Sequence, residues 1–246
     1  MTELTDITAV ILAGGMGTRL QDVVDDRSKV MAEVAGRPFV TYLLDQLEEV
    51  GVRRVVICTG HHANHLENKL GDKYGEMELV YSRENEPMGT GGALRMALPL
   101  LESDPVLVLN GDSYCSVNLA HCFEAHARYN GAGVLCLCEK PDTASYGSVD
   151  LGDDSEIVGF REKDATSGPG WINAGVYLLN RELIESIPSD RAVSLEREIF
   201  PDWTGRGLFG YRSDCELLDI GTPERYEQAE TFFASLASAR KKGSVA

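Results

Sequence analysis

The stretch "AVILAGGMGTRLQDVVDDRSKVMAEVAGRPF", residues 9–39, decides the fold of this chain. Its apolar start continues the run from Ile7 to Leu12, which predicts a buried strand that ends at a glycine-rich turn. Glycines after a strand let backbone amides approach an anion closely. Arg19 and Lys29 add two cations to a chain whose formal net charge is −16. The stretch therefore favours a phosphate site over a plain tight turn.

Two common phosphate-binding motifs do not fit this turn. Gly15 and Gly17 have the spacing of the dinucleotide fingerprint, but Leu20 stands where its last glycine would be. A P-loop needs Gly-Lys-Ser or Gly-Lys-Thr, which does not follow here. The broken fingerprint disfavours a dinucleotide-dependent oxidoreductase.

Strand and helix patterns alternate from this turn to about residue 138. A helix is expected after Pro38, with Gly51 at its end, and a second helix over residues 61–75. Strands are expected at 53–60, 77–82, 104–112 and 132–138, with helices at 91–101 and 119–130. This alternation predicts an α/β, Rossmann-like fold, in which a mostly parallel central sheet carries helices on both faces.

The alternation of strand and helix patterns does not continue past residue 140. Residues 146–152 and 156–163 predict two antiparallel strands, and further strands are expected at 171–180, 208–213 and 215–221. A helix is expected near Leu195, and Thr222 with Pro223 predicts the start of a final helix. We expect one domain over residues 1–246. Its first half is about 7–140, its second about 141–230, and a helix end and tail follow over 231–246.

The composition indicates a soluble globular protein, because 43% of the 246 residues are hydrophobic and 25% charged. The first residues, "MTELTDI", have no signal region, and no apolar run reaches a membrane span. We therefore expect a cytoplasmic protein. The charge of −16 argues against nucleic acid and anionic membranes as partners.

The cysteine pattern gives no metal-site signature. No pair has the C-x-x-C spacing, and Cys136 and Cys138 alternate along an expected strand. Buried free thiols are therefore favoured over a zinc site for all six cysteines. The cluster His61, His62 and His65 likewise favours a helix start near the surface over a metal site.

"LAGGMGTRL" together with Lys29 resembles the signature of the sugar-1-phosphate nucleotidylyltransferases, a family with a GT-A-type nucleotide-diphospho-sugar transferase fold. Val30 departs from that signature, since the family usually has proline after the lysine. Other segments continue the resemblance to about residue 230, namely "EPMGTGGAL" (86–94), "LNGDSY" (109–114), "YGSV" (146–149), "FREK" (160–163), "NAGVYLLN" (173–180) and "LLDIGTPERY" (217–226).

The resemblance implies a set of site residues. The nucleotide would contact Leu12, Ala13, Gly14, Gly15, Gly17, Thr18, Arg19, Gly89, Thr90 and Gly111. The sugar phosphate would contact Tyr146, Gly147, Glu162, Lys163, Asn173 and Gly175, in the small antiparallel portion formed by the second half. Asp112 and Asp219 match the family's metal-binding aspartates, and Arg19, Lys29 and Asp112 would be catalytic.

The implied reaction is attack by a sugar-1-phosphate oxygen on the α-phosphorus of a nucleoside triphosphate, with pyrophosphate leaving. Two anions must approach each other, so positioning and electrostatics supply most of the catalysis. Asp112 and Asp219 offer the hard oxygen ligands that suit Mg²⁺. Arg19 would hold the β- and γ-phosphates, Lys29 would neutralise charge at the reacting phosphorus, and Lys163 would hold the sugar phosphate.

Each of these residues also has an ordinary structural interpretation. Asp112 follows Gly111 in what could be a simple turn, and Lys163 could form a surface pair with Glu162. Asp219 is less easily explained in this way, because a charge on an apolar strand costs free energy unless it is paired or ligated. The joint presence of these residues argues against a non-catalytic nucleotide-binding module.

Within the family, the set of segments is most similar to members that use GTP and D-glycero-α-D-manno-heptose 1-phosphate, for bacterial surface polysaccharide or glycoprotein synthesis. Mannose, glucose or N-acetylmuramate 1-phosphate with GTP or UTP stays open, because no single residue reads guanine or heptose. The resemblance also suggests a homodimer.

Overall fold

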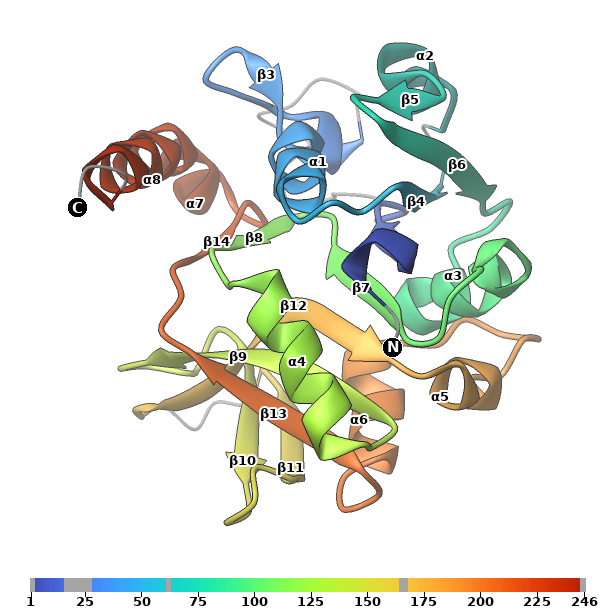
Figure 1. The fold of residues 1–246 in the computed structure, drawn as a ribbon, viewed down its shortest axis with the longest axis vertical. Helices are drawn as coiled ribbons and strands as arrows, with labels where there is room; N and C mark the ends of the chain where they lie inside the picture. Colours follow the sequence, from blue (N-terminus) through green and yellow to red (C-terminus); the bar gives the residue numbers. More distant parts are fainter. Residues whose placement is uncertain (1–2, 16–27, 61–62, 164–167, 244–246) are drawn as a thin grey trace.

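The computed structural model describes residues 3–15, 28–60, 63–163 and 168–243. Its central strands are β7 (Val106–Asn110), β1 (Thr8–Leu12), β4 (Arg54–Thr59) and β6 (Met77–Arg83), adjacent in that order and all parallel. The short strand β5 (Lys73–Tyr74) pairs antiparallel with β6 at the edge of the sheet. Figure 1 shows this sheet across the upper half of the molecule. The predicted α/β fold with a mostly parallel centre is confirmed.

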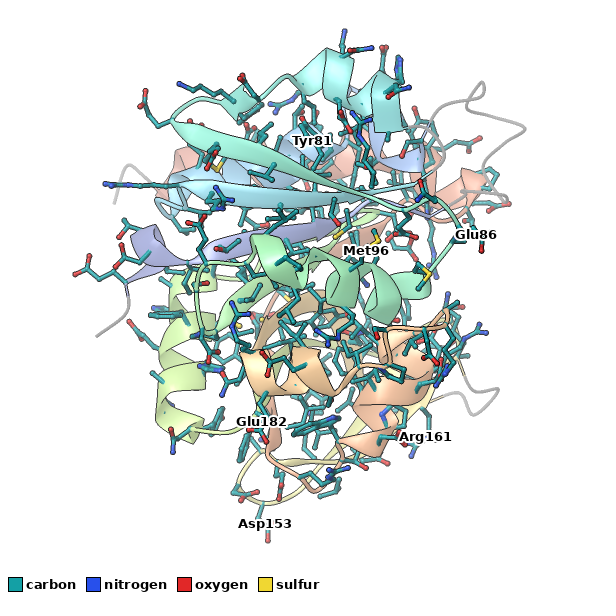
Figure 2. The ribbon with its side chains drawn as sticks, turned by 90° about the vertical axis from the view of Figure 1, so that its right-hand side faces the viewer. Tyr81, Glu86, Met96, Asp153, Arg161 and Glu182 are labelled. Carbon is teal, nitrogen blue, oxygen red and sulfur yellow. A yellow bond between two sulfur atoms is a disulfide. The ribbon has the colours of Figure 1, made fainter. Side chains whose placement is uncertain are left out.

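A strand from the second half of the chain extends the sheet on its other side. β12 (Gly170–Leu179) pairs antiparallel with β7 on one edge and with β9 (Gly133–Lys140) on the other. β10 (Gly147–Leu151) and β11 (Ile157–Glu162) form the predicted antiparallel pair beside β12, with Asp153 at the tip of their turn (Figure 2). β13 (Leu208–Ser213) lies parallel to β9.

Alternation along the buried strands produces two hydrophobic cores. In β1, Ala9 and Ile11 face one core and Val10 faces the other. The first core is covered by α1 (Val40–Glu49), α2 (Ala63–Leu70), α4 (Leu119–Tyr129) and α8 (Ala229–Gly243). The second is covered by α3 (Gly89–Ala97), α5 (Arg181–Ser186), the π-helix η4 (Leu195–Ile199) and α6 (Phe200–Asp202). Helices therefore cover both faces, as predicted.

A small second sheet lies at the carboxyl end of the parallel strands. β8 (Ser113–Cys115) pairs antiparallel with β14 (Leu217–Asp219), and Asp219 stands opposite Ser113. The Ile220 amide donates to the Asp112 carbonyl at 3.0 Å. This ladder brings Asp112 and Asp219 together from distant parts of the sequence. A third sheet pairs β2 (Glu33–Val34) with β3 (Arg37–Pro38), and short 3₁₀ helices occupy Leu4–Asp6, Lys29–Met31 and Leu98–Leu100.

Two of the predicted helices differ from the described structure, and one helix was missed. The helix expected over 61–75 ends at Leu70, because Gly71 takes a φ of 73° and the chain turns into β5. The final helix is divided into α7 (Pro223–Glu227), which Thr222 caps as predicted, and α8. α5 was not predicted at all. His65 is exposed on α2, while His61 and His62 lie outside the described residues.

The prediction of six free thiols is wrong for two cysteines. Cys138 on β9 and Cys215 before β14 form a disulfide across a sequence separation of 77 residues. The sequence spacing does not indicate this pair, because Cys215 lies beside Cys138 only once the chain has folded. Cys58, Cys115, Cys122 and Cys136 are buried free thiols, as predicted. No helix among the described residues is long and apolar enough to cross a membrane.

Candidate active site

A cavity of about 420 Å³ opens where β1 and β7 end, and a second of about 660 Å³ adjoins it. The two share Gly15, Asp112, Ser145, Lys163 and Asp219. Most predicted site residues line one or both cavities, namely Leu12, Gly14, Gly15, Lys29, Gly89, Thr90, Asp112, Tyr146, Gly147, Glu162, Lys163, Asn173, Gly175 and Asp219.

Five predicted residues are not among those that line these two cavities. Ala13 and Gly111 lie beside the cavity, on the strand ends behind it. Their backbones are engaged, since the Gly111 amide donates to the Leu12 carbonyl at 3.0 Å. The remaining three, Gly17, Thr18 and Arg19, lie outside the described residues.

Close backbone packing shapes the end of the cavity where the predicted nucleotide-binding residues lie. A Cβ on Gly111 would lie 2.6 Å from the Leu12 carbonyl oxygen and 3.0 Å from Val30, the residue that replaces the family's proline. Gly89, with a φ of 71°, begins α3, where a Cβ would lie 2.5 Å from the Val193 carbonyl oxygen. Neither position has room for a side chain. Glycine is therefore required where the chain leaves β7 beside Leu12 and where α3 begins beside Val193.

Glu84 lies at this end of the cavity, in the loop from β6 to α3 that Figure 2 marks at Glu86. Its Oε2 accepts a hydrogen bond from the Met88 amide at 2.8 Å. A Cβ on Gly14 would lie 2.5 Å from its Oε1, so the carboxylate packs directly on the glycine turn. Burial raises the pKa of Glu84, and the hydrogen bond from Met88 opposes that rise.

Lys29 and Asp112 form an ion pair on the cavity wall. The Lys29 Nζ lies 2.6 Å from the Asp112 Oδ2, and the Ser113 hydroxyl donates to the other carboxylate oxygen at 3.2 Å. Burial opposes ionisation of Asp112, but the Lys29 charge and these hydrogen bonds outweigh it and hold the pKa of Asp112 below its ordinary value. The Lys29 side chain is 13% exposed and that of Asp112 41%, so the carboxylate stays open to the cavity.

Asp219 is held by a second cation. Arg225 Nη1 lies 2.6 Å from its Oδ2, and the Gly221 amide donates to its Oδ1 at 2.5 Å. The Arg225 guanidinium also lies 4.8 Å from the centre of the Tyr146 ring. The site thus has two ion pairs, Lys29–Asp112 and Arg225–Asp219, on the wall of the second cavity. An anionic ligand in this cavity would meet the cations of Lys29 and Arg225.

The opposite wall comes from the second half of the chain. Lys163 follows β11 with a φ of 42°, and its amide donates to the Tyr146 carbonyl at 3.2 Å. Its Nζ lies 3.8 Å from the Glu162 Oε1. Burial is the main cause that raises the pKa of Glu162, and the Lys163 charge opposes it. The Lys163 side chain is 45% exposed and lines both cavities.

A buried tyrosine joins three residues of the cavity wall. The Tyr177 hydroxyl accepts from Asn173 Nδ2 at 2.8 Å and Asn110 Nδ2 at 3.2 Å, and donates to Glu196 Oε1 at 3.4 Å. Burial and the Glu196 carboxylate raise the pKa of Tyr177 well above its ordinary value, so the hydroxyl keeps its proton. The other oxygen of Glu196 accepts from Thr90 at 2.7 Å. This network links the predicted nucleotide and sugar walls.

Sequence reasoning missed Glu84, Asn110, Glu196 and Arg225 as cavity residues. Asn110 and Arg225 stand inside the segments 109–114 and 217–226 that carry the family resemblance, so membership of the segments that hold Asp112 and Asp219 was an available signal. Glu196 reaches the cavity from η4, and no local pattern indicates that contact.

Comparisons with known proteins agree with this geometry. The family described as nucleotidyl transferase matches residues 8–235. A D-glycero-alpha-D-manno-heptose 1-phosphate guanylyltransferase of Aneurinibacillus thermoaerophilus is 33% identical, over 90% of this chain and 96% of that protein. A mannose-1-phosphate guanylyltransferase of Mycobacterium tuberculosis is also 33% identical, over 89% of this chain. The chain spans 62% of the length of that second relative.

Solved structures show the same fold. HddC from Yersinia pseudotuberculosis has a TM-score of 0.82 and 33% identity, over 92% of this chain and 99% of that one. HddC has also been solved in complex with GMP-PN. The family match over residues 8–235, the shared fold and the convergence of the described signature residues on two adjoining cavities lead to one conclusion: this chain belongs to the nucleotidyl transferase family.

Proposed function

We propose that the chain is a sugar-1-phosphate guanylyltransferase that transfers GMP from GTP to D-glycero-α-D-manno-heptose 1-phosphate and releases pyrophosphate. One observation carries the proposal: the pairs Lys29–Asp112 and Asp219–Arg225 lie between a glycine turn and Lys163 around two adjoining cavities. The relatives named above support guanylyl transfer, and the heptose enzyme matches this chain over nearly its full length. Such a product would serve bacterial surface polysaccharide or glycoprotein synthesis.

The residues divide the reaction between two walls. Gly14, Gly15 and Thr90 bind the nucleotide, and Arg19 holds the β- and γ-phosphates. Lys163 holds the sugar phosphate from the opposite wall and brings its oxygen in line with the α-phosphorus. Lys29 offsets the negative charge that accumulates at the reacting phosphorus. No side-chain nucleophile is required, because the sugar phosphate supplies the attacking oxygen.

Asp112 and Asp219 fit a Mg²⁺ ion. They provide two hard carboxylates held close together by the ladder that pairs Asp219 with Ser113. Each carboxylate oxygen has a second lone pair besides the one in its present hydrogen bond. When bound, the ion would stabilise charge on the α-phosphate and on the leaving pyrophosphate. Lys29 orients the Asp112 carboxylate, and Arg225 orients that of Asp219.

Glu84 suits the recognition of guanine. A carboxylate can only accept hydrogen bonds, and guanine offers N–H donors on its Watson–Crick edge. The Met88 amide fixes one carboxylate oxygen and leaves lone pairs for the base. Guanine offers two adjacent N–H donors to a carboxylate, whereas uracil and adenine each offer one on that edge, so the residue supports GTP over UTP or ATP.

Mannose 1-phosphate is the second candidate acceptor, and the mannose-1-phosphate guanylyltransferase at 33% identity favours it specifically. We further propose that residues 1–246 form one domain with a nucleotide-binding and a sugar-phosphate-binding half, and that the protein is a homodimer.

The test is a pyrophosphate-release assay with Mg²⁺, crossing the four nucleoside triphosphates with a panel of sugar 1-phosphates. Release with GTP and the heptose phosphate is the expected result. Release with GTP and mannose 1-phosphate instead would show that the acceptor is mannose 1-phosphate and would leave the proposed type of reaction unchanged. Asp112→Asn should abolish most turnover, whereas Asp153→Asn, at the distant hairpin tip, should not. No release in any combination would refute the proposal.

A further inference from the structure

A disulfide lies directly beside the strand that carries Asp219. Cys215 stands four residues before Asp219 and is bonded to Cys138 on β9. Cys138 is fully buried, while Cys215 is partly exposed. The bond therefore ties the segment that enters β14 to the central sheet, and Cys215 is its partly exposed residue.

β14 is held by noncovalent contacts, which include the bond from the Ile220 amide to the Asp112 carbonyl and the ion pair of Asp219 with Arg225. It is three residues long and pairs with β8 alone in its sheet, within the described part of the chain. Glu216 adds two contacts to the same neighbour, since its carbonyl accepts from the Ser116 amide and its own amide donates to the Ser116 hydroxyl. A short edge ladder of this kind opens easily unless it is tethered. The disulfide adds a covalent tether to the contacts that keep Asp219 opposite Ser113.

A third cysteine belongs to the same cluster. Cys115, the last residue of β8, has its sulfur 3.8 Å from that of Cys138, and the sulfurs of Cys115, Cys138 and Cys215 all lie within 4.8 Å of one another. Burial raises the pKa of Cys115 to about 12, so this thiol keeps its proton and does not displace Cys215 from the disulfide at neutral pH. Opening of the bond therefore requires a thiol from outside.

We propose that the Cys138–Cys215 disulfide is a redox-controlled clamp on the metal-binding strand. When the bond is formed, it holds Asp219 against Asp112. When a dithiol reduces it, residues 214–219 loosen and the paired carboxylates bind Mg²⁺ less tightly. The consequence for Mg²⁺ rests on the proposed function, whereas the clamp itself does not.

The chemistry is ordinary thiol–disulfide exchange. One thiolate of the dithiol attacks the sulfur of the partly exposed Cys215, the disulfide breaks, and Cys138 leaves as a thiolate that takes up a proton. The second thiol of the reagent then attacks the reagent's own bonded sulfur and releases Cys215. The protein gains two electrons and two protons, and the dithiol becomes a cyclic disulfide.

The first experiment measures the clamp without substrate. Thiol titration of the denatured chain should give four free thiols before treatment with dithiothreitol and six after it. Hydrogen exchange of the native protein should become at least fivefold faster in peptides covering 214–219 after reduction, with the parallel strands β1 and β4 unchanged. Six thiols in a sample treated with oxidised glutathione, or unchanged exchange after two thiols are released, would overturn the proposal.

The second experiment measures Mg²⁺ dependence. The Mg²⁺ concentration for half-maximal pyrophosphate release should rise at least threefold on reduction and return on reoxidation. Cys215→Ala should have the Mg²⁺ dependence of the reduced parent protein, and dithiothreitol should not change it. Cys58→Ala, which replaces a buried cysteine on β4, should respond to dithiothreitol as the parent does. An identical Mg²⁺ dependence in both states would overturn the link to the metal strand. If the oxidised protein releases no pyrophosphate at all, the proposed function fails, and the exchange experiment still decides the clamp.

Discussion

The replacement Tyr177→Phe tests whether the buried hydroxyl organises the cavity wall. It removes one oxygen and keeps the ring, which packs on Phe200 with centroids 4.9 Å apart. The lost oxygen has partners at 2.8, 3.2 and 3.4 Å, so Asn173, Asn110 and Glu196 each lose a contact. The Asn110 Oδ1 already has no partner among the described residues, so this side chain has nothing else to hold its orientation.

The size of the effect follows from those contacts. The two bonds at 3.2 Å or less are worth about 1 kcal/mol each, and water in the cavity can replace part of the longest one. We expect a loss of about 2 kcal/mol in the free energy of unfolding, which for a chain of this size lowers Tm by about 4–8 °C. If about 1.4 kcal/mol of this loss also appears in acceptor binding, KM for the sugar phosphate rises about tenfold.

The assay pairs calorimetry with steady-state kinetics. KM for GTP should change less than threefold, because Tyr177 does not line the cavity and reaches the nucleotide only through Thr90 and Glu196. Tyr211→Phe is the matched control, since the hydroxyl of Tyr211 has no hydrogen-bond partner among the described residues. A Tyr177→Phe protein with the parent's Tm and the parent's KM for both substrates would refute the reasoning.

Three further outcomes are expected. Lys163→Ala should raise KM for the sugar phosphate more than for GTP, with Lys163→Arg restoring most of the loss; equal effects on both substrates would remove Lys163 from the acceptor wall. Glu84→Gln should lower kcat/KM for GTP about tenfold and change that for ATP less than threefold, as measured in competition between the two, because an amide offers one acceptor where the carboxylate offers two. The fold lowers the pKa of Asp112. The charge of Asp112 therefore stabilises the folded protein at pH values above the pKa of about 4 that the group has in the unfolded chain. This stabilisation is lost as the pH falls through the lower pKa of the folded protein. Tm measured from pH 7 to pH 2.5 should therefore fall less steeply for Asp112→Asn than for the parent at the acid end, and parallel curves would contradict the assignment.

Local patterns in the sequence were sufficient for most of the fold. The buried strands read as apolar runs closed by glycine, and Thr222 with Pro223 marked a helix start that the structure confirms. These signals depend on neighbours within a few residues, which a sequence displays directly. The division between α7 and α8 and the presence of α5 depend on packing against the sheet, so local patterns did not show them.

The site residues also divide into those that local patterns indicated and those that depend on contacts between distant segments. Lys29, Asp112 and Asp219 could be named from motifs. In the structure the ladder of β8 and β14 brings Asp219 beside Asp112, and Lys29 joins them through its ion pair with Asp112. Glu196 and the disulfide partners Cys138 and Cys215 could not be named from motifs, because contacts between segments far apart in the chain leave no trace in spacing. Tyr177 was placed on an expected strand, but the hydrogen bonds of its hydroxyl required coordinates.

The placement of β12 between β7 and β9 has a consequence for synthesis of the chain. β7 can pair with β1 as soon as it is made, but its other edge and both edges of β9 have no sheet partner until β12, which ends at residue 179, has been made. During that interval the emerging chain exposes the unpaired edge of a buried, apolar strand, which is a template for aggregation. A fragment that stops near residue 140 would keep that edge permanently, so the two halves should fold when made as one chain and fail to fold when expressed apart.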